Sequence, residues 1–536
     1  MKKIISFIMS VIMSLSLVGL VGCGEKVPNT DQTLEVYLMD LGYGSDWLQP
    51  MLDAFAQEDW VKEEYPELII AKQINDTAGY GRTQLESDTT IDLLMTTGMD
   101  STKLLYDITE DVYNKIVPGE TVLYKEKIRK SFAESMATVK SYGDDPKYYA
   151  TPWADGMMSI LYNENVLQAA GISVPNTTDE FLAACQKLKT TQFPGKKDGF
   201  YPIAQGYDDS YWDSLFPVLW AQYDGVDGVD NFYNGIVGDE LTKDIFSYYV
   251  GRKYAVEFME QALDSTKGYL NPKSLDTNNF KTTQYNLLRG YSAFNANGDW
   301  FPSEMKATIA EMHRNNYEVS TIKIMRVPII SKIVDKTPSI KTVATNMSKT
   351  NDEMLSLIVS EIDAGATTSS YSGITQTDFD YIRKARGVVS SIGAYHCATI
   401  PNYAVGKKVA CDFLRFMATE KAMKIYIENT CGANLPFNID CETIKENDWY
   451  DSIDVLHKER IDYFYSENLT LQVLPTTNKY PLVKFGGVMA FAELEFYNKL
   501  SIPNRKLTAQ KYFEDCLKLW SDTKWDKALR DAGYKE

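Results

Sequence analysis

Apolar stretches of strand length alternate with amphipathic helical stretches along this chain, and this alternation limits the possible folds more than any other feature. Residues 34–39 read LEVYLM, and a glycine-containing turn and a helix with one apolar face follow, for which Ser45 is the expected cap. Further apolar strands are expected at 67–74 and 90–97. Strands that alternate with helices form a mainly parallel sheet with helices on its faces. The sequence therefore predicts an α/β fold.

Four aromatic or acidic residues follow the carboxyl ends of these first strands. Tyr43, Asp46 and Trp47 lie in the turn after the first strand, and Asp100 follows the third. In α/β sheets the loops at the carboxyl ends of the strands form the usual ligand-binding edge. We therefore expect these side chains near a ligand, with Trp47 the weakest candidate of the four.

A second α/β unit is expected to begin at the segment TPWADGMMSILYN. One strand runs up to Pro152 and another covers 157–162, and a helix at 164–170 ends at Gly171, a residue type that favours the left-handed conformation after a helix. A Thr-x-x-Glu capping box then starts the next helix at Thr177.

Two later regions depart from this alternation. Residues 331–380 are rich in Ser, Thr and Asp and contain one helix-like stretch, NDEMLSLIVSEI, so we interpret them as an insertion. Residues 485–534 are predicted to be helical. Their expected apolar face is formed by Phe513, Cys516, Leu517 and Trp520.

The first residues have the pattern of an export signal. Two lysines precede an apolar run that ends in the sequence LVGC at Cys23. This ending resembles a bacterial lipobox, in which the cysteine thiol receives a diacylglycerol before cleavage. We expect residues 1–22 to be a signal peptide, residues 23–32 a lipid-anchored tether, and the protein to lie on the extracellular face of the cell membrane. The alternative is an uncleaved membrane-spanning anchor, since the apolar run approaches the length of a span.

Composition excludes several classes of function. The chain of 536 residues has a net charge of −18, and a protein that binds nucleic acid needs clustered Lys and Arg. Only three His residues occur and no Cys-x-x-Cys pair, so neither a zinc site nor a cofactor is expected. Cys431 and Cys441 either form a disulfide or remain free thiols, whereas Cys185 and Cys411 lie among apolar residues and are expected to be buried.

Catalytic motifs are equally scarce. The sequence has no Gly-x-Ser-x-Gly elbow, no His-Glu-x-x-His pair and no phosphate-binding loop. A glycoside hydrolase stays open as an alternative because it needs only two suitably separated carboxylates. We nevertheless expect a binding protein with no catalytic residues.

Three tryptophans stand beside polar residues at expected turns or strand ends. An indole can cover the C–H face of a sugar while Asp or Asn side chains bond to its hydroxyl groups. Each tryptophan could instead anchor the core. The three groups are Trp153 with Asp155, Tyr211 with Trp212, and Asn297 and Asp299 with Trp300.

The stretch from Tyr148 to Lys189 resembles the first lobe crossing of family 1 extracellular solute-binding proteins, the maltose-binding protein class of bacterial ABC importers. The family also has a Gly-x-Trp after an apolar strand and an Ala-x-x-Phe-Leu helix, here ACDFL. The matching residues are Tyr162, Asn163, Gly171, Pro175, Thr177, Glu180, Gly298, Trp300, Leu435 and Pro436. The resemblance covers most of residues 20–440, and the chain departs from it through the insertion and a longer C-terminus.

This resemblance implies a two-lobed periplasmic-binding-protein-like fold of the class II type that closes on its ligand by a hinge. Each lobe would be a mainly parallel sheet flanked by helices, with extra helices at the C-terminus. Lobe I would comprise 31–151 and 392–447, and lobe II 153–388 and 450–536.

The resemblance also implies ligand-facing residues and partners. Trp153, Asp155 and Tyr395 would line the lobe crossings, and Trp212 and Trp300 would face them from lobe II. The ligand would be a carbohydrate, with an oligosaccharide favoured by the many aromatic candidates, and the partners would be permease subunits. The protein would be a monomer. A receptor for a peptide or another polar solute is the alternative within transport.

Overall fold

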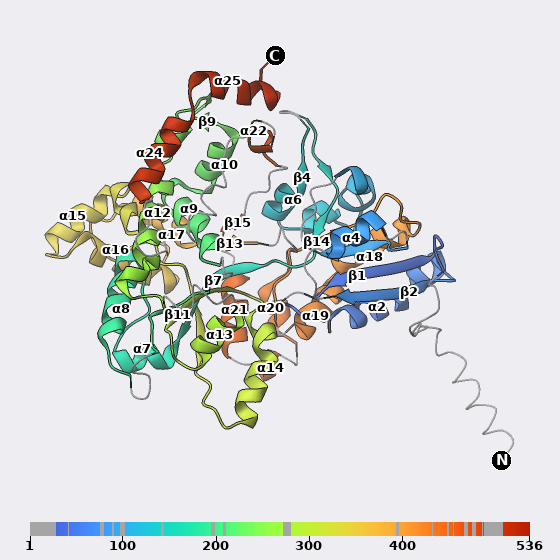
Figure 1. Ribbon diagram of the computed structural model, residues 1–536, viewed down its shortest axis with the longest axis horizontal. Coiled ribbons are helices and arrows are strands. Elements are labelled where there is room, and N and C mark those ends of the chain that lie inside the picture. Colours follow the sequence, from blue (N-terminus) through green and yellow to red (C-terminus); the bar gives the residue numbers. More distant parts are fainter. Residues whose placement is uncertain are drawn as a thin grey trace. The chain divides into compact units, whose positions relative to one another are not determined.

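The computed structural model forms two compact units, and every structural statement below concerns its described residues (Figure 1). Unit 1 contains the described parts of Met1–Lys127, Tyr148–Trp153 and Tyr395–Tyr426; unit 2 contains those of Ile128–Lys147, Ala154–Ala394 and Ile427–Glu536. The described residues are 28–40, 42–75, 80–87, 90–96, 102–140, 144–193, 199–206, 211–271, 280–392, 396–430, 432–447, 450–453, 455–465, 470–473, 479–484, 486 and 508–535.

Unit 1 is built on a sheet with the strand order β2-β1-β3-β14-β6. The first three strands in the sequence are parallel, as expected, whereas β14 runs antiparallel to both of its neighbours. The strands are β1 Thr33–Met39, β2 Ile69–Asn75, β3 Leu93–Thr96, β6 Thr151–Pro152 and β14 Cys397–Thr399. Since β14 is the only reversed strand of this sheet, the sheet is mainly parallel.

Helices of unit 1 pack their apolar faces against this sheet and against each other. In α2 the predicted face of Leu48, Met51, Leu52 and Phe55 is buried. The expected cap at Ser45 is wrong, because α2 begins after Trp47 and no side chain caps it. The helices are α2 Leu48–Gln57, α3 Asp59–Glu64, α4 Tyr80–Ser87, α5 Tyr124–Lys127 and α18 Lys407–Met417, while α19 Glu420–Asn429 crosses the boundary after Tyr426.

Unit 2 has a six-stranded sheet with the order β15-β13-β7-β11-β8, and β12 also pairs with β7. Strand β7 is antiparallel to β11, β12 and β13, while β8 and β15 are parallel to their neighbours. All other strands therefore share one direction, and β7 alone is reversed. The strands are β7 Met157–Asn163, β8 Ile203–Ala204, β11 Phe294–Gly298, β12 Ile322–Met325, β13 Val388–Ser391 and β15 Thr470–Val473.

Helix α7 has the predicted bounds, and α8 begins at the predicted cap. The Asn163 side chain accepts a hydrogen bond from the Val166 N–H at the start of α7 Glu164–Ala170, and Gly171 ends this helix with φ of 59°. The Thr177 side chain caps α8 Thr178–Thr190 through the Glu180 N–H. The capping box is not reciprocal, because the Glu180 carboxylate accepts from the Asn176 N–H instead.

Further helices complete unit 2 and enclose its core. The aromatic residues of α9 and α10 lie in that core with the inner faces of α8 and α12. The helices are α6 Lys130–Met136, α9 Phe216–Asp224, α10 Val226–Asn234, α11 Ile245–Tyr248, α12 Gly251–Leu263, α13 Phe280–Leu288, α14 Phe301–Arg314, α20 Cys441–Lys445, α21 Val455–Phe464 and α22 Pro481–Lys484.

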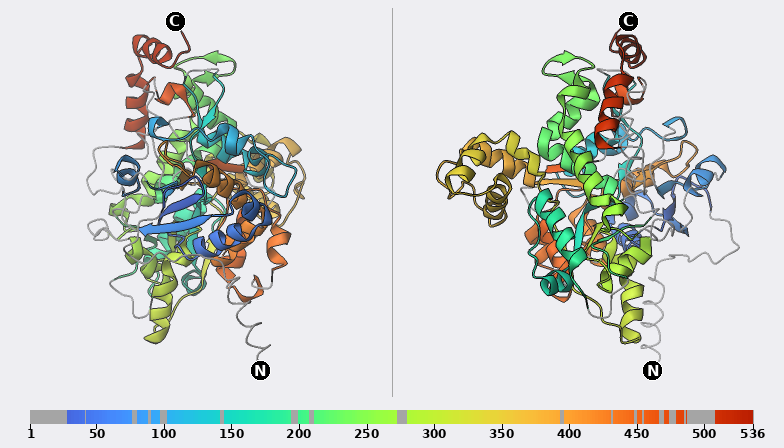
Figure 2. Two further views of the ribbon diagram at one scale, coloured as in Figure 1. Left: turned by 90° about the vertical axis from the view of Figure 1, so that its right-hand side faces the viewer. Right: turned by 60° about the vertical axis from the view of Figure 1, so that its left-hand side comes forward.

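The insertion at 331–380 holds more structure than the single expected helix. Three helices, α15 Pro338–Asn346, α16 Asn351–Asp363 and α17 Gln376–Arg386, project from the rest of unit 2 (Figure 2, right). They share a core that contains Ile340, Ile358 and Phe379, each fully buried. The Ser, Thr and Asp content concealed α15 and α17, because short amphipathic helices need only three or four apolar residues on one face.

The C-terminal segment is helical where it is described, but its predicted apolar face is partly wrong. Helices α24 Ala509–Leu519 and α25 Asp522–Asp531 pack on unit 2 through Tyr512 and Trp525, whereas Leu517 is 40% exposed. Cys516 and Trp520 are partly buried against the core. Among the described helices, none is both long and apolar enough to cross a membrane.

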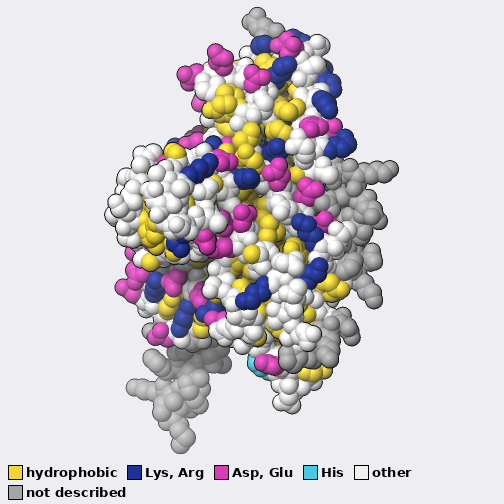
Figure 3. Space-filling model, turned by 90° about the vertical axis from the view of Figure 1, so that its left-hand side faces the viewer, with side chains coloured by type: hydrophobic (Ala, Val, Ile, Leu, Met, Phe, Trp, Pro, Cys, Tyr) yellow, Lys and Arg dark blue, Asp and Glu magenta, His cyan; other side chains and the backbone are white. Residues whose placement is uncertain are grey.

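Acidic and basic side chains are interspersed on the face of the molecule shown in Figure 3. No continuous basic stripe is visible among the described residues of that face.

Candidate functional site

The segment PWAD lies at a point where the chain passes from one unit to the other. Trp153 is the last residue of its segment in unit 1, and Ala154 is the first residue of the next segment, which belongs to unit 2. Trp153 and Asp155 therefore belong to different units although one residue separates them. Each is described below with the residues of its own unit.

Trp153 lies in a cluster of buried aromatic rings in unit 1, here called the aromatic cluster: Tyr43, Trp47, Trp153, His396 and Tyr426. The Trp153 indole stacks on Trp47 with ring centroids 5.4 Å apart and 24° between the planes. Edge contacts join it to Tyr43 at 5.9 Å and to His396 at 5.5 Å. Tyr426 contacts Trp47 at 5.0 Å. The structure thus brings three predicted residues together, namely Tyr43, Trp47 and Trp153.

The two indoles of the aromatic cluster are buried, and only that of Trp47 donates a hydrogen bond among the described residues. Trp153 is 1% exposed, and its Nε1–H has no acceptor among the described residues. Trp47 Nε1–H donates to the Gly44 carbonyl at 3.1 Å. Burial lowers the pKa of His396 to about 4, so its imidazole is neutral at pH 7. Sequence reasoning missed His396 and Tyr426, because neither stands beside a carboxylate or a tryptophan.

Asp155 lies in a separate cluster of polar groups in unit 2, here called the polar cluster: Arg129, Asp155, Asp299, Ser391 and Asn434. Arg129 Nη1 donates to Asp155 Oδ2 at 2.9 Å, and the Asp155 N–H donates to the Asn434 carbonyl at 3.1 Å. The Asn434 N–H donates to Asp299 Oδ2 at 2.9 Å, and the Ser391 hydroxyl donates to the Asp155 carbonyl. The backbone of Asn434 thus bonds to the backbone N–H of Asp155 and to the carboxylate of Asp299.

The charge state of Asp155 depends on opposing influences. Complete burial is the strongest and raises its pKa, the Arg129 guanidinium lowers it, and the Asp299 carboxylate raises it again, to about 8 overall. Asp155 Oδ1 has no partner among the described residues. A carboxyl that binds a proton near neutral pH can still accept the hydrogen bond from Arg129 through Oδ2.

Tyr211 and Trp300 form an aromatic pair in unit 2, with ring centroids 5.4 Å apart and 58° between the planes. Trp300 follows the carboxyl end of β11, and Tyr211 follows that of β8, its parallel neighbour. Gly298 allows this placement, because a Cβ there would overlap the Trp300 indole. Tyr211 is half-buried and Trp300 is buried.

The remaining predicted residues are not brought into one place. Trp212 is fully buried in the core of unit 2, where its ring contacts Phe181. The Asn297 amide is occupied within β11, since it donates to Asn295 Oδ1 and accepts from the Gly298 N–H. Asp46 is exposed. The predicted residues Cys23, Asp100 and Tyr395 lie outside the described residues, as does Cys431, whose pairing with Cys441 the sequence left open.

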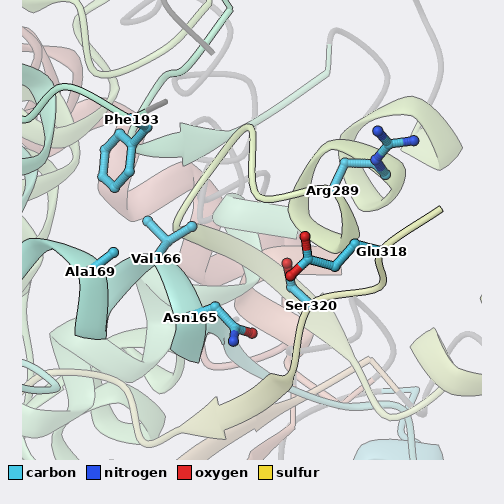
Figure 4. A pocket seen from close by; sticks show the side chains of 7 residues that line it. All are labelled: Asn165, Val166, Ala169, Phe193, Arg289, Glu318 and Ser320. Atoms are coloured by element: carbon cyan, nitrogen blue, oxygen red, sulfur yellow. The ribbon is translucent and has the colours of Figure 1, made fainter. Parts of the chain in front are cut away.

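One pocket of unit 2, of about 250 Å³, contains none of the predicted residues. Apolar side chains of Val166, Ala169 and Phe193 lie on one side of it, opposite Glu318 and Ser320 (Figure 4). Its cation, Arg289, donates to the Tyr285 hydroxyl at 3.1 Å and lies over the Tyr317 ring. Because the guanidinium already has these partners, we assign no ligand to this pocket. The described residues include no group of three or more His, Cys, Asp and Glu able to hold a metal ion.

Comparison with known proteins supports the resemblance found in the sequence. Residues 71–322 match the model of a family described as bacterial extracellular solute-binding protein. This part of the chain is therefore similar to bacterial extracellular solute-binding proteins. No curated protein sequence matches this chain.

Solved structures show that this chain shares its fold with several solute-binding proteins. A Streptococcus pneumoniae solute-binding protein in complex with the blood group A-trisaccharide is 15% identical, with a TM-score of 0.53, 91% of this chain covered and 99% of that one. The sugar-binding protein MalE from Xanthomonas citri is 12% identical, with a TM-score of 0.53 and coverages of 93% and 98%. An ABC substrate-binding protein from Listeria monocytogenes in complex with cycloalternan is 14% identical, with a TM-score of 0.52 and coverages of 94% and 99%. These likenesses confirm the predicted fold class.

Proposed function

We propose that this chain is the lipid-anchored receptor of an ABC importer and captures a carbohydrate, in particular an oligosaccharide. Closure of its two lobes about a hinge would enclose the sugar and signal to the permease subunits. The family match and the sugar complexes of structurally similar proteins support the proposal. The lobe boundaries, the monomeric state and the anchor at Cys23 belong to it as expectations from the sequence.

The observation that carries the proposal is the aromatic pair of Tyr211 and Trp300. It follows the carboxyl ends of two adjacent parallel strands, which is the edge where α/β sheets usually bind ligands. The faces of aromatic rings are negative and attract the weakly positive C–H groups of a sugar. The half-buried Tyr211 ring is the part of this pair that a ligand reaches first. Tyr43, Asp46, Trp47, Asp100, Trp153, Asn297, Asp299 and Tyr395 remain proposed contacts from the sequence.

Binding of an oligosaccharide panel to Tyr211→Ala tests the proposal. A stacked ring contributes roughly 0.5–1.5 kcal/mol beyond its buried area, so the affinity of any sugar that the wild type binds should fall by about threefold to tenfold. Titration calorimetry measures the affinity, and the melting temperature first identifies the bound sugars because a ligand stabilises the folded state.

Trp520→Phe is the matched control, since Trp520 packs on Phe246 away from the aromatic pair and should leave affinity unchanged. Stabilisation by peptides but by no sugar in the panel would overturn the carbohydrate assignment in favour of a peptide receptor. Hydrolysis of an oligosaccharide that a single Asp or Glu substitution abolishes would instead establish a glycoside hydrolase.

A further inference from the structure

The chain passes between the units at five places. Residues of the polar cluster lie in the unit 2 segments next to four of these passages. The passages follow residues 127, 147, 153, 394 and 426. Arg129 is the second residue of unit 2 after the first passage, and Asp155 is the second after the third. Ser391 precedes the fourth passage, and Asn434 follows the fifth. All of these residues belong to unit 2.

Asp155 bonds directly to each of the other three segments. Its carboxylate accepts from the Arg129 side chain, its N–H donates to the Asn434 carbonyl, and its own carbonyl accepts from the Ser391 hydroxyl. One residue therefore joins four segments through its side chain, its N–H and its carbonyl.

Neighbouring backbone bonds tie the same segments together around Asp155. The Arg129 N–H donates to the Pro436 carbonyl at 2.8 Å, and the Ile392 N–H donates to the Gly156 carbonyl at 2.9 Å. The Arg129 guanidinium also lies 5.3 Å from the centre of the Tyr465 ring, and the Tyr465 hydroxyl accepts from the Leu435 N–H at 3.2 Å. These contacts fix the side chain of Arg129 from a second direction.

Asp155 is fully buried, so its polar atoms are not available to a ligand without a rearrangement of these contacts. A buried polar group with satisfied hydrogen bonds restrains local structure, because each lost bond leaves a partner desolvated and unpaired. Asp155 therefore has the position and the bonding of a structural restraint.

We propose that Asp155 is a positioning residue that holds the unit 2 ends of four chain passages in one fixed arrangement. Removal of its carboxylate should loosen these segments while the rest of unit 2 stays folded. The proposal makes no use of the ligand, so its failure and that of the proposed function can be told apart.

Native-state hydrogen exchange of the full-length, ligand-free chain tests the proposal with Asp155→Ala. Asp155→Ala keeps the N–H and carbonyl bonds of residue 155 and removes its side-chain bond to Arg129. Because the bonded segments are expected to open together, exchange in peptides covering 128–130, 390–392 and 434–436 should accelerate on the order of tenfold, as the opening free energy falls by about one buried hydrogen bond. Exchange in α9 and α12 should stay as in the wild type. Asp155→Asn should restore slow exchange, since its amide oxygen can still accept from Arg129.

The matched control is Asp363→Ala, which breaks the ion pair between Asp363 and the buried Arg386 in the same unit and removes no bond of Asp155. It should leave exchange at the three segments unchanged. If Asp155→Ala does not fold, Arg129→Met removes the same bond from the other side and should give the same local acceleration. Unchanged exchange at the three segments, uniform acceleration throughout unit 2, or no rescue by Asp155→Asn would each overturn the proposal.

Discussion

Trp153 and Asp155 show how strongly surroundings decide the role of a residue. Both follow Pro152 within three positions, yet Trp153 stacks on Trp47 in unit 1 and Asp155 bonds to Arg129 in unit 2. The indole gains from burial among rings, whereas the carboxyl costs free energy on burial unless it is bonded. The chain thus passes between the units just after Trp153, so that the buried indole lies in unit 1 and the hydrogen-bonded carboxyl of Asp155 lies in unit 2.

His396 in the aromatic cluster should make folding stability sensitive to acid. Its pKa is about 4 in the folded protein because of burial, against 6.5 when the chain is unfolded. The unfolded state therefore binds a proton first, and the free energy of unfolding should fall as the pH drops from about 6.5 to 4. His396→Phe keeps a ring at this position and should lose roughly 2–3 kcal/mol less than the wild type between pH 7 and pH 4.5.

Urea unfolding at the two pH values measures this difference. The exposed His313 offers the control, and His313→Phe should follow the wild type. Equal acid sensitivity of wild type and His396→Phe would contradict the assignment of the effect to His396.

Local signals around α7 and α8 agree with the structure, whereas elements that need distant partners were not predicted. Helix α8 begins at the predicted cap Thr177 and α7 ends at the predicted Gly171, since such signals act within one turn. The predicted cap Ser45 of α2 is the exception. The reversal of β7 and β14 has no local signal, because strand direction depends on which neighbours a strand meets. Helices α15 and α17 were missed for the same reason: their few apolar residues count only once they share a core with α16.

The capping box of α16 should stabilise the insertion. Thr350 Oγ1 accepts from the Glu353 N–H at 3.1 Å, and Glu353 Oε2 accepts from the Thr350 N–H at 2.7 Å. Thr350→Ala removes the first bond and should lower the free energy of unfolding by about 1 kcal/mol. Thr350→Ser keeps the hydroxyl and should be close to wild type. Urea unfolding followed by circular dichroism compares the three proteins, and an equal loss in both variants would argue against the cap.

At the scale of the whole molecule, the family match supports an extracellular place of action. The proposed lipid on Cys23 would hold the protein on the extracellular face of the membrane. Two or three acyl chains hold a protein durably on a membrane, because each buried CH₂ contributes about 0.8 kcal/mol.

Cys23→Ala should release the protein from the cell surface, since no thiol remains to receive the lipid. Cell fractionation and metabolic labelling with a radioactive fatty acid measure the result. Cys516→Ala, which alters a half-buried thiol in α24, should stay labelled and membrane-bound. A labelled Cys23→Ala protein would refute the anchor.

The sequence by itself determined the α/β alternation, the end of α7 at Gly171, the cap of α8 at Thr177 and the resemblance to solute-binding proteins, because these depend on local spacing and on a linear motif. It also pointed to Trp153, Asp155 and Trp300 through their neighbours in the chain. Only the tertiary structure decided that Trp153 is stacked in one unit and Asp155 is bonded in the other, and that Trp212 lies in the core. Burial and hydrogen bonding at these positions come from residues as distant in sequence as His396 and Asn434, and no local pattern encodes such partners.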